Sequence, residues 1–293
     1  MAVVEELARK GFGVNALVNR RGVETSGRDV RVVRADLFDA ATLAAQMSEC
    51  SAVIHLVGII MEKPRAGVTF DRMHVEATRS VVDAAKRAGV RRFVHMSALG
   101  TRAGASSDYH KTKWLAEEIV RSSGLDWTIF RPSMIHGPRG EFMRMEAKWV
   151  RKQSPPFFFM PYFGKGLFGF GGAGTIQPVF VGDVARAFVE SIDNPKSVGK
   201  EYAISGAQEL SWPEMHRMVA RMITGKSRLA LPIPAWYAKA LAAVVPAALL
   251  PFNRDQVIMS QEDNTADTSK FERDFGWKTT GFEESLRSYV NRL

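Results

Sequence analysis

Two side chains that can share a proton, Tyr109 and Lys113, stand four residues apart in the sequence Y-H-K-T-K. The stretch that leads to them starts at Arg92 as a short apolar run, passes through a Gly/Ser/Ala loop and restarts as a helix, for which Asp108 can serve as the N-cap. Residues four apart share one face of a helix, so we expect the phenol and the ammonium to point at the same spot. A neighbouring ammonium favours phenolate over phenol, which would let Tyr109 exchange a proton with a substrate hydroxyl or carbonyl. Such a pair also arises by chance on helix surfaces, so the rest of the chain has to decide.

Short apolar segments alternate with amphipathic ones over most of the chain. Several of them are apolar throughout, which is typical of strands buried on both faces. The alternation predicts an α/β fold, a Rossmann-type doubly wound parallel sheet covered by helices on both faces. The expected strands are 14–18, 30–33, 52–57, 92–96, 126–130, 176–180 and 201–204, and the expected helices are the first ten residues, 40–47, 70–88, the helix of Tyr109, 183–192 and 212–223.

The composition changes after Arg131 and Pro132. Residues 155–174 read P-P-F-F-F-M-P-Y-F-G-K-G-L-F-G-F-G-G-A-G, which favours neither helix nor strand. A flexible flap over a pocket and a loop that docks to a partner or a membrane both fit this composition. We expect a dinucleotide-binding core over 1–195, in which 136–175 is a flap or substrate-lobe insertion. A smaller C-terminal lobe over 196–293 should be helical from residue 212 to the end.

The chain carries a formal net charge of +9, from 40 Lys and Arg against 31 Asp and Glu. These basic residues are spread along the chain and do not interleave with aromatic ones, which disfavours nucleic acid as a partner. Cofactor phosphates, an acidic protein partner or an anionic membrane surface fit the charge better.

The single cysteine, Cys50, cannot form an internal disulfide, and the first ten residues form an amphipathic helix pattern rather than a secretory leader. We therefore expect a cytoplasmic protein, with a peripheral position at the inner face of a membrane as an alternative. No apolar stretch reaches the roughly 20 residues of a spanning helix. The nearest, 238–252, is interrupted by Pro246 and Pro251, and we expect it to pack as a core helix rather than lie on a membrane surface.

Five short segments occur in an order that carries a family resemblance. Together they resemble the extended and atypical short-chain dehydrogenase/reductase superfamily, the group of NAD-dependent epimerases and dehydratases. Residues 231–276 look most like the branch that contains the nucleotide-binding accessory subunit of respiratory complex I. The five segments are A-D-L-F-D at 35–39, V-I-H-L-V-G at 53–58, Y-H-K-T-K at 109–113, R-P-S-M-I-H-G-P at 131–138 and Q-P-V-F-V-G-D-V-A-R-A at 177–187.

The resemblance implies a dinucleotide site at the carboxyl ends of the strands. Asp36 would reach the adenine, with Leu37 packing beside it, although Asp36 could instead be a simple helix N-cap. The end of the next strand, Leu56, Val57 and Gly58, would line the dinucleotide where small residues permit close backbone approach.

At the nicotinamide end, the resemblance implies that Lys113 holds the ribose and that Tyr109 is the proton donor or acceptor. Arg131 and Pro132 would close this side, although Arg131 could instead form a surface ion pair. The family's third catalytic residue, a Ser or Thr, is replaced here by Ala98. The preceding Ser97 can deputise, and Ser106 and Ser107 are closer to Tyr109 in sequence.

Cofactor choice is normally decided at the end of the second strand, where an acid binds the 2′-hydroxyl of NAD and an arginine binds a 2′-phosphate. Here the chain offers Asn19, Arg20 and Arg21 and no acid, so we expect NADP(H), with Arg20 as a ligand. The six histidines show no metal-ligand spacing, and we expect no metal.

A glycine-rich turn before the first helix is missing from the given sequence, which opens with M-A-V-V-E-E-L-A-R-K-G. In a dinucleotide-binding sheet this turn follows the central first strand and seats the pyrophosphate on a helix N-terminus. We therefore expect the first strand to be lacking, either because the start is internal to the natural reading frame or because the chain is truncated and binds cofactor poorly. The alternative is a family member that has dispensed with the dinucleotide.

Two classes of function remain open at this point. The first is an NADP(H)-dependent oxidoreductase or epimerase-like enzyme, which the Tyr109 and Lys113 pair favours, with an unidentified small-molecule substrate. The second is a non-catalytic nucleotide-binding accessory subunit of a larger, membrane-associated assembly, which Ala98 and the aromatic segment 155–174 favour.

Overall fold

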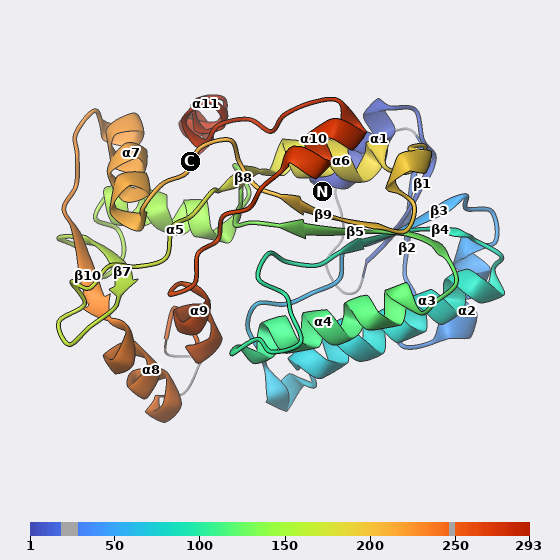
Figure 1. Ribbon diagram of the computed structural model, residues 1–293, viewed down its shortest axis with the longest axis horizontal. Coiled ribbons are helices and arrows are strands. Elements are labelled where there is room, and N and C mark those ends of the chain that lie inside the picture. The colour runs from blue at the N-terminus through green and yellow to red at the C-terminus, as the bar shows by residue number, and fades with distance from the viewer. Residues whose placement is uncertain (19–28, 246–249) are drawn as a thin grey trace. The chain divides into compact units, whose positions relative to one another are not determined.

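The computed structural model describes residues 1–18, 29–245 and 250–293, which belong to two compact units (Figure 1). The first unit comprises 1–132, 182–203 and 268–277, and the second comprises 133–181, 204–267 and 278–293. The chain thus returns twice to the first unit, because 182–203 and 268–277 pack with its sheet and helices although they are distant in sequence. The division into a core over 1–195 with an insertion over 136–175 and a lobe over 196–293 stays a prediction.

A four-stranded sheet in the order β3-β4-β5-β9 forms the centre of the first unit. Strands β3, β4 and β5 are parallel, and a separate parallel pair is formed by β1 and β2. The elements of this unit are α1 Ala2–Arg9, β1 Val14–Leu17, β2 Val30–Val33, α2 Ala40–Met47, β3 Ala52–His55, η1 Pro64–Ala66, η2 Asp71–Glu76, α3 Ala77–Arg87, β4 Arg92–Met96, α4 Asp108–Arg121, β5 Asp126–Pro132, α6 Val181–Glu190, η3 Pro195–Ser197, β9 Lys200–Ile204 and α10 Ser269–Phe275.

Helices cover both faces of the central sheet, with α2, α3 and α4 on one side and α6 and α10 on the other (Figure 1). Because successive strand residues point to opposite faces, Ile129 packs with Leu43 of α2 in one core, while Phe130 contacts Phe188 of α6 in the other, at 4.7 Å between ring centroids. The predicted Rossmann-type fold is confirmed.

Two predicted elements of the first unit differ from the structure. The strand expected over 52–57 ends at His55, and the helix expected over 70–88 begins as the short π-helix η2 before continuing as α3. Single π-turns of this kind occur frequently at functional sites, and η2 contributes His74 to the site described below.

The second unit is built around helices α5, α7 and α11, whose buried side chains include Met143, Met215 and Phe282. Helix α7 begins with a capping box between Ser211 and Glu214. The elements of this unit are β6 Ile135–His136, α5 Glu141–Val150, β7 Met160–Gly164, β8 Val179–Phe180, α7 Trp212–Thr224, β10 Ala230–Pro234, α8 Ala235–Val244, α9 Arg254–Met259, α11 Phe282–Arg287 and η5 Val290–Arg292.

Three sequence predictions for the second unit are wrong in part. Strand β7 lies within 155–174, where neither helix nor strand was expected, and β10 interrupts the region expected to be helical after residue 212. The two strands pair in parallel, so a partner distant in sequence overrides the local composition. Strand β8 pairs with β6 in a two-stranded sheet, not with the central sheet.

Within the three described ranges, we find no helix that combines the length and the apolar character needed to cross a membrane.

Candidate functional site

Helix α4 carries the proton-sharing pair and is fixed at its start by Ser107. The Ser107 hydroxyl accepts a hydrogen bond from the backbone N–H of His110 at 3.2 Å, so Ser107 is the N-cap. The expectation that Asp108 is the cap is wrong by one residue. Asp108 lies in the first turn, where its negative charge still suits the helix dipole, and it pairs with Lys111 at 2.9 Å.

Lys113 lies almost fully buried behind the ends of two strands. Its ammonium donates a hydrogen bond to the carbonyl of Met96, the last residue of β4, at 3.0 Å. A Cβ placed on Gly58, just beyond β3, would lie only 2.9 Å from the Lys113 Nζ. The structure thus brings together Lys113 and Gly58, two residues assigned to one site, and a side chain at position 58 would have to displace the ammonium.

Tyr109 lies one turn before Lys113, against an aromatic wall. Its ring meets those of Phe70 and His74 edge to face, with centroids 5.8 Å and 5.3 Å away. Burial raises the pKa of Tyr109 to about 12 and lowers the pKa of Lys113 to about 8, while the nearby Glu117 carboxylate acts in the opposite direction on Lys113. The expected lowering of the Tyr109 pKa is therefore not what the structure gives, because burial disfavours the charged phenolate.

His74 is a site residue that the sequence did not single out. The His74 Nε2 lies 3.1 Å from both the backbone nitrogen and the carbonyl oxygen of Ile59. Its Nδ1 lies 2.9 Å from the Thr112 hydroxyl. Burial, and secondly the charge of Lys113, lower the pKa of His74 to about 3, so the ring is neutral and anchors the loop after β3 to α4.

Ser97, the expected substitute for the third catalytic residue, faces the protein interior. It is 2% exposed, and its hydroxyl is 3.4 Å from that of Thr101, another residue that the sequence analysis overlooked. Its backbone N–H is bound to the Phe130 carbonyl at 2.7 Å. Of the two other serines considered, Ser107 is engaged in capping and Ser106 is exposed.

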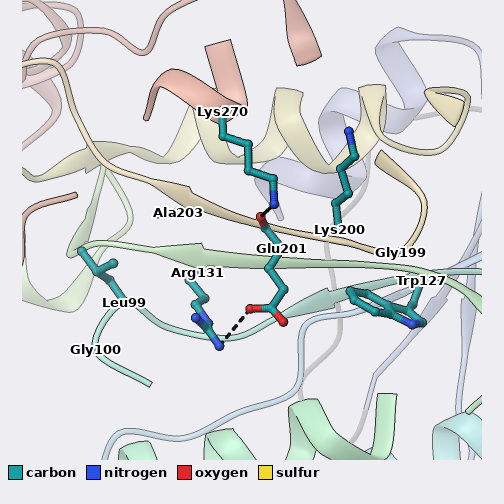
Figure 2. A pocket seen from close by; sticks show the side chains of 9 residues that line it. All are labelled: Leu99, Gly100, Trp127, Arg131, Gly199, Lys200, Glu201, Ala203 and Lys270. Carbon is teal, nitrogen blue, oxygen red and sulfur yellow. Dashed lines mark hydrogen bonds and ion pairs between the residues drawn. The ribbon is translucent and has the colours of Figure 1, made fainter. Parts of the chain in front are cut away.

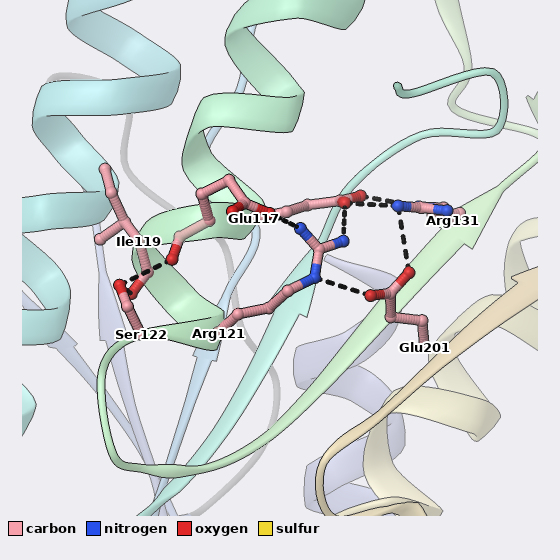
Figure 3. Close-up of polar contacts among 7 residues, drawn as sticks. Glu117, Ile119, Arg121, Ser122, Arg131 and Glu201 are labelled. Atoms are coloured by element: carbon pink, nitrogen blue, oxygen red, sulfur yellow. Dashed lines mark hydrogen bonds and ion pairs between the residues drawn. The ribbon is translucent and has the colours of Figure 1, made fainter. Parts of the chain in front are cut away.

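Arg131 belongs to an ion-pair network in the first unit (Figure 3). The fully buried carboxylate of Glu117 accepts hydrogen bonds from Arg131 Nε at 2.8 Å and from Arg121 at 2.5 Å. Glu201 of β9 binds both arginines, at 2.7 Å to Arg121 and 3.1 Å to Arg131. The network connects α4 to β5 and β9, and the Arg131 guanidinium already has two carboxylate partners. The neighbouring Pro132 is buried, and its carbonyl accepts a hydrogen bond from the Leu99 N–H at 2.9 Å.

A shallow recess of about 360 Å³ lies beside this network, along β5 and β9 (Figure 2). Trp127, Arg131 and Glu201 form part of its wall, and the Lys270 ammonium reaches the Glu201 carbonyl at 2.9 Å. Neither Tyr109 nor Lys113 lines it. We therefore place the candidate site at Lys113 and Gly58, on the chemistry of the groups present, rather than in this recess.

The residues expected to bind the adenine end of the dinucleotide make fewer contacts than those around Lys113. The exposed Asp36 accepts from the Phe38 N–H at 3.0 Å and is not a helix cap, because Asp39 caps α2. Leu37 packs on the edge of the hydrophobic core. Leu56 is 37% exposed, and Val57 is half-buried between it and Gly58. The predicted cofactor residue Arg20, with Asn19 and Arg21, lies outside the described residues.

A protein-family model described as NAD(P)H-binding matches residues 1–148. The chain is 30% identical over 253 residues to the mitochondrial NADH dehydrogenase [ubiquinone] 1 alpha subcomplex subunit 9 of Arabidopsis thaliana, with 82% of this chain and 59% of that protein covered. It is 27% identical over 203 residues to an NAD(P)H azoreductase of Xenophilus azovorans, with 68% and 58% covered. The chain thus spans less than two thirds of the length of either relative.

Among solved structures, the chain resembles a UDP-glucose 4-epimerase of Thermotoga maritima determined with UDP-glucose. The TM-score is 0.73 at 18% identity, over 99% of this chain and 93% of that one. At this level of identity the similarity establishes the fold, a Rossmann-type fold of the epimerase kind.

We predict that Glu117→Gln lowers the free energy of unfolding by about 3 kcal/mol, because it leaves two partly buried guanidinium groups without their shared charge. Denaturant titration measures the change. Glu118→Gln is the matched control: Glu118 also pairs with Arg121 but is 52% exposed, and its loss should cost at most about 1 kcal/mol. Equal losses in the two variants would contradict a stabilising role specific to the buried carboxylate.

Proposed function

Because the chain belongs to the NAD(P)H-binding family, we propose that its first unit binds a nicotinamide dinucleotide beside Lys113 and acts as an NADP(H)-dependent oxidoreductase or epimerase-like enzyme. The observation that carries this proposal is the buried Lys113 ammonium, fixed by the Met96 carbonyl and facing a position where Gly58 has no side chain. A ribose carries hydroxyl groups that can accept from such an ammonium, and the absence of a Cβ allows close approach. Lys113 and Gly58 therefore fit the nicotinamide end of the dinucleotide.

Lys113 would hold the ribose, with Leu56, Val57 and Gly58 along the dinucleotide and Asp36 toward the adenine. Lys113 has a pKa near 8, so about nine in ten of these side chains are charged at pH 7. The bound reduced dinucleotide would supply a hydride. The proposal of NADP(H) over NAD(H) rests on Arg20 and on the lack of an acid near it.

Tyr109 would supply the proton. With a pKa raised to about 12, its hydroxyl is neutral at physiological pH and is suited to donate to a substrate oxygen or nitrogen rather than to withdraw a proton. A phenolate formed by that donation would be stabilised by the Lys113 ammonium one helical turn away. His74, which is neutral, would hold the aromatic wall that orients the phenol.

A second candidate function is that of an accessory subunit, which would keep the dinucleotide site as a structural element within a respiratory, complex I-like assembly. The Arabidopsis relative is named as a subunit of such an enzyme, and Ala98 with the inward-facing Ser97 leaves no obvious third catalytic hydroxyl. In this case we propose a location at the inner face of a membrane, peripheral to it.

We predict that Gly58→Ala weakens dinucleotide binding at least about tenfold, because the new Cβ displaces the Lys113 ammonium and costs one charge-assisted hydrogen bond. Titration with NADPH, and with NADH for comparison, measures the affinity. Gly13→Ala is the control, since a Cβ there meets nothing within 4 Å. Unchanged affinity in a folded Gly58→Ala protein would argue against a ribose at Lys113.

Tyr109→Phe separates the two candidate functions. An enzyme should lose at least about a hundredfold in turnover, because the proton donor is gone, while its NADPH affinity stays the same. The readout is NADPH oxidation with carbonyl and azo acceptors, with Tyr162→Phe as the control. Full turnover in the Tyr109→Phe variant would contradict the enzymatic role, and normal incorporation of this variant into a respiratory assembly would support the accessory role.

A further inference from the structure

Large apolar side chains of the second unit face solvent in two segments, 147–182 and 215–254. Their exposed fractions run from 44% to 83%. An apolar surface of this kind in a folded protein marks a site of interaction. The side chains are Phe157, Phe158, Leu167, Phe168, Phe170, Leu229, Trp236, Tyr237 and Val244.

Five of these residues form what we call the aromatic tip: Leu167, Phe168, Phe170, Trp236 and Tyr237. The first three are in the loop that follows β7, and the last two are in α8, which follows β10 directly. The Trp236 Nε1 donates to the Leu167 carbonyl at 3.0 Å, so the loop and the helix are neighbours. Strands β7 and β10 are paired in parallel and present both elements at the same end (Figure 1).

The loop has a fixed shape that its own backbone provides. The Lys165 N–H donates to the Gly172 carbonyl at 2.7 Å, and the Gly171 N–H donates back to the Lys165 carbonyl at 2.8 Å. A Cβ on Gly164 would lie 1.8 Å from the Gly169 carbonyl oxygen, so only glycine permits the loop to fold down onto its own strand. Gly164 and Gly169 therefore face neighbouring backbone and Pro232, and the large side chains face outward, with Leu167, Phe168 and Phe170 between 67% and 76% exposed.

The two segments that carry the tip are rich in basic residues. Segment 147–182 contains four Lys or Arg residues and segment 215–254 contains six, and within these two segments there is no Asp or Glu. Lys165 begins the loop, and Lys239 lies in α8 within one turn of Trp236. Asp263, from another segment, is close enough to Lys165 to feel its charge, but basic residues outnumber acidic ones around the tip. Aromatic side chains combined with an excess of basic ones match the interface of an anionic bilayer, where the rings sit at headgroup depth and the cations meet phosphates.

We propose that the aromatic tip docks this protein on the surface of an anionic lipid bilayer. The exposed rings and Leu167 enter the headgroup region, and the surrounding Lys and Arg residues bind lipid phosphates. Part of this surface is α8, whose second half overlaps the segment 238–252 that was expected to pack in the core. Only Ala235 and Ala238 of this helix are buried, while Trp236 and Tyr237 are about half exposed. The proposal does not depend on dinucleotide binding or on catalysis.

The full chain is tested by co-sedimentation with vesicles of phosphatidylcholine alone and of phosphatidylcholine with phosphatidylserine. We expect binding to the mixed vesicles that weakens as salt is added, and a loss of at least about tenfold in the double variant Phe168→Ser/Phe170→Ser. Leu115→Ser, which removes a 48% exposed leucine of α4 in the first unit, is the matched control and should bind like the native chain. Thermal unfolding checks that the variants are folded.

A second measurement does not rely on the double variant. Brominated lipids should quench part of the tryptophan fluorescence of the native chain, and Trp236→Phe should remove that part. Equal binding by the native chain and Phe168→Ser/Phe170→Ser, equal affinity for neutral and anionic vesicles, or no quenching assignable to Trp236 would overturn the proposal. So would self-association of the native chain that the double variant abolishes, since a second copy would then cover the tip.

Discussion

A buried ammonium is costly unless the protein surrounds it with acceptors and a counter-charge, and the candidate site of this chain is organised around that requirement at Lys113. The Met96 carbonyl at the end of β4 accepts its hydrogen bond, and Gly58 at the end of the neighbouring strand leaves the space beside it open. Glu117, one turn further along α4, is the charge that favours the protonated form. The ammonium is thus held at the carboxyl edge of the parallel sheet, where open α/β folds bind their ligands.

The same carboxylate connects the site to the sheet. Glu117 has no contact with solvent, and its carboxylate is bound by Arg121 and Arg131, which share Glu201 between them (Figure 3). Loss of the Glu117 carboxylate would weaken the attachment of α4 to the strands and remove the charge that favours protonated Lys113. The resemblance assigned Arg131 to the nicotinamide. In this structure Arg131 binds Glu117, which in turn acts on Lys113 through its charge.

Local patterns in the sequence were sufficient for the parts of the fold and site that depend on neighbouring residues. The spacing of Tyr109 and Lys113 correctly placed the two residues one turn apart on one helix, and the helix period and the apolar runs located most elements of the first unit. What they could not give is the degree of burial, which reverses the expected direction of the Tyr109 pKa. The role of His74 likewise depends on a contact with α4 that lies 38 residues away in sequence. The pairing of β7 with β10 joins segments with no local strand signal, so composition alone misjudged both.

The most direct test is the pKa of Lys113 itself, measured by NMR titration of its labelled side chain and assigned by the loss of that signal in Lys113→Arg. Burial predicts a midpoint near pH 8. Between that pH and about 10.4 the folded chain would bind fewer protons than the unfolded chain, so the free energy of unfolding should rise across the same window. A midpoint near 10.4, the value of an ordinary exposed lysine, with no such rise, would show that the ammonium is solvated and would contradict the account of the site.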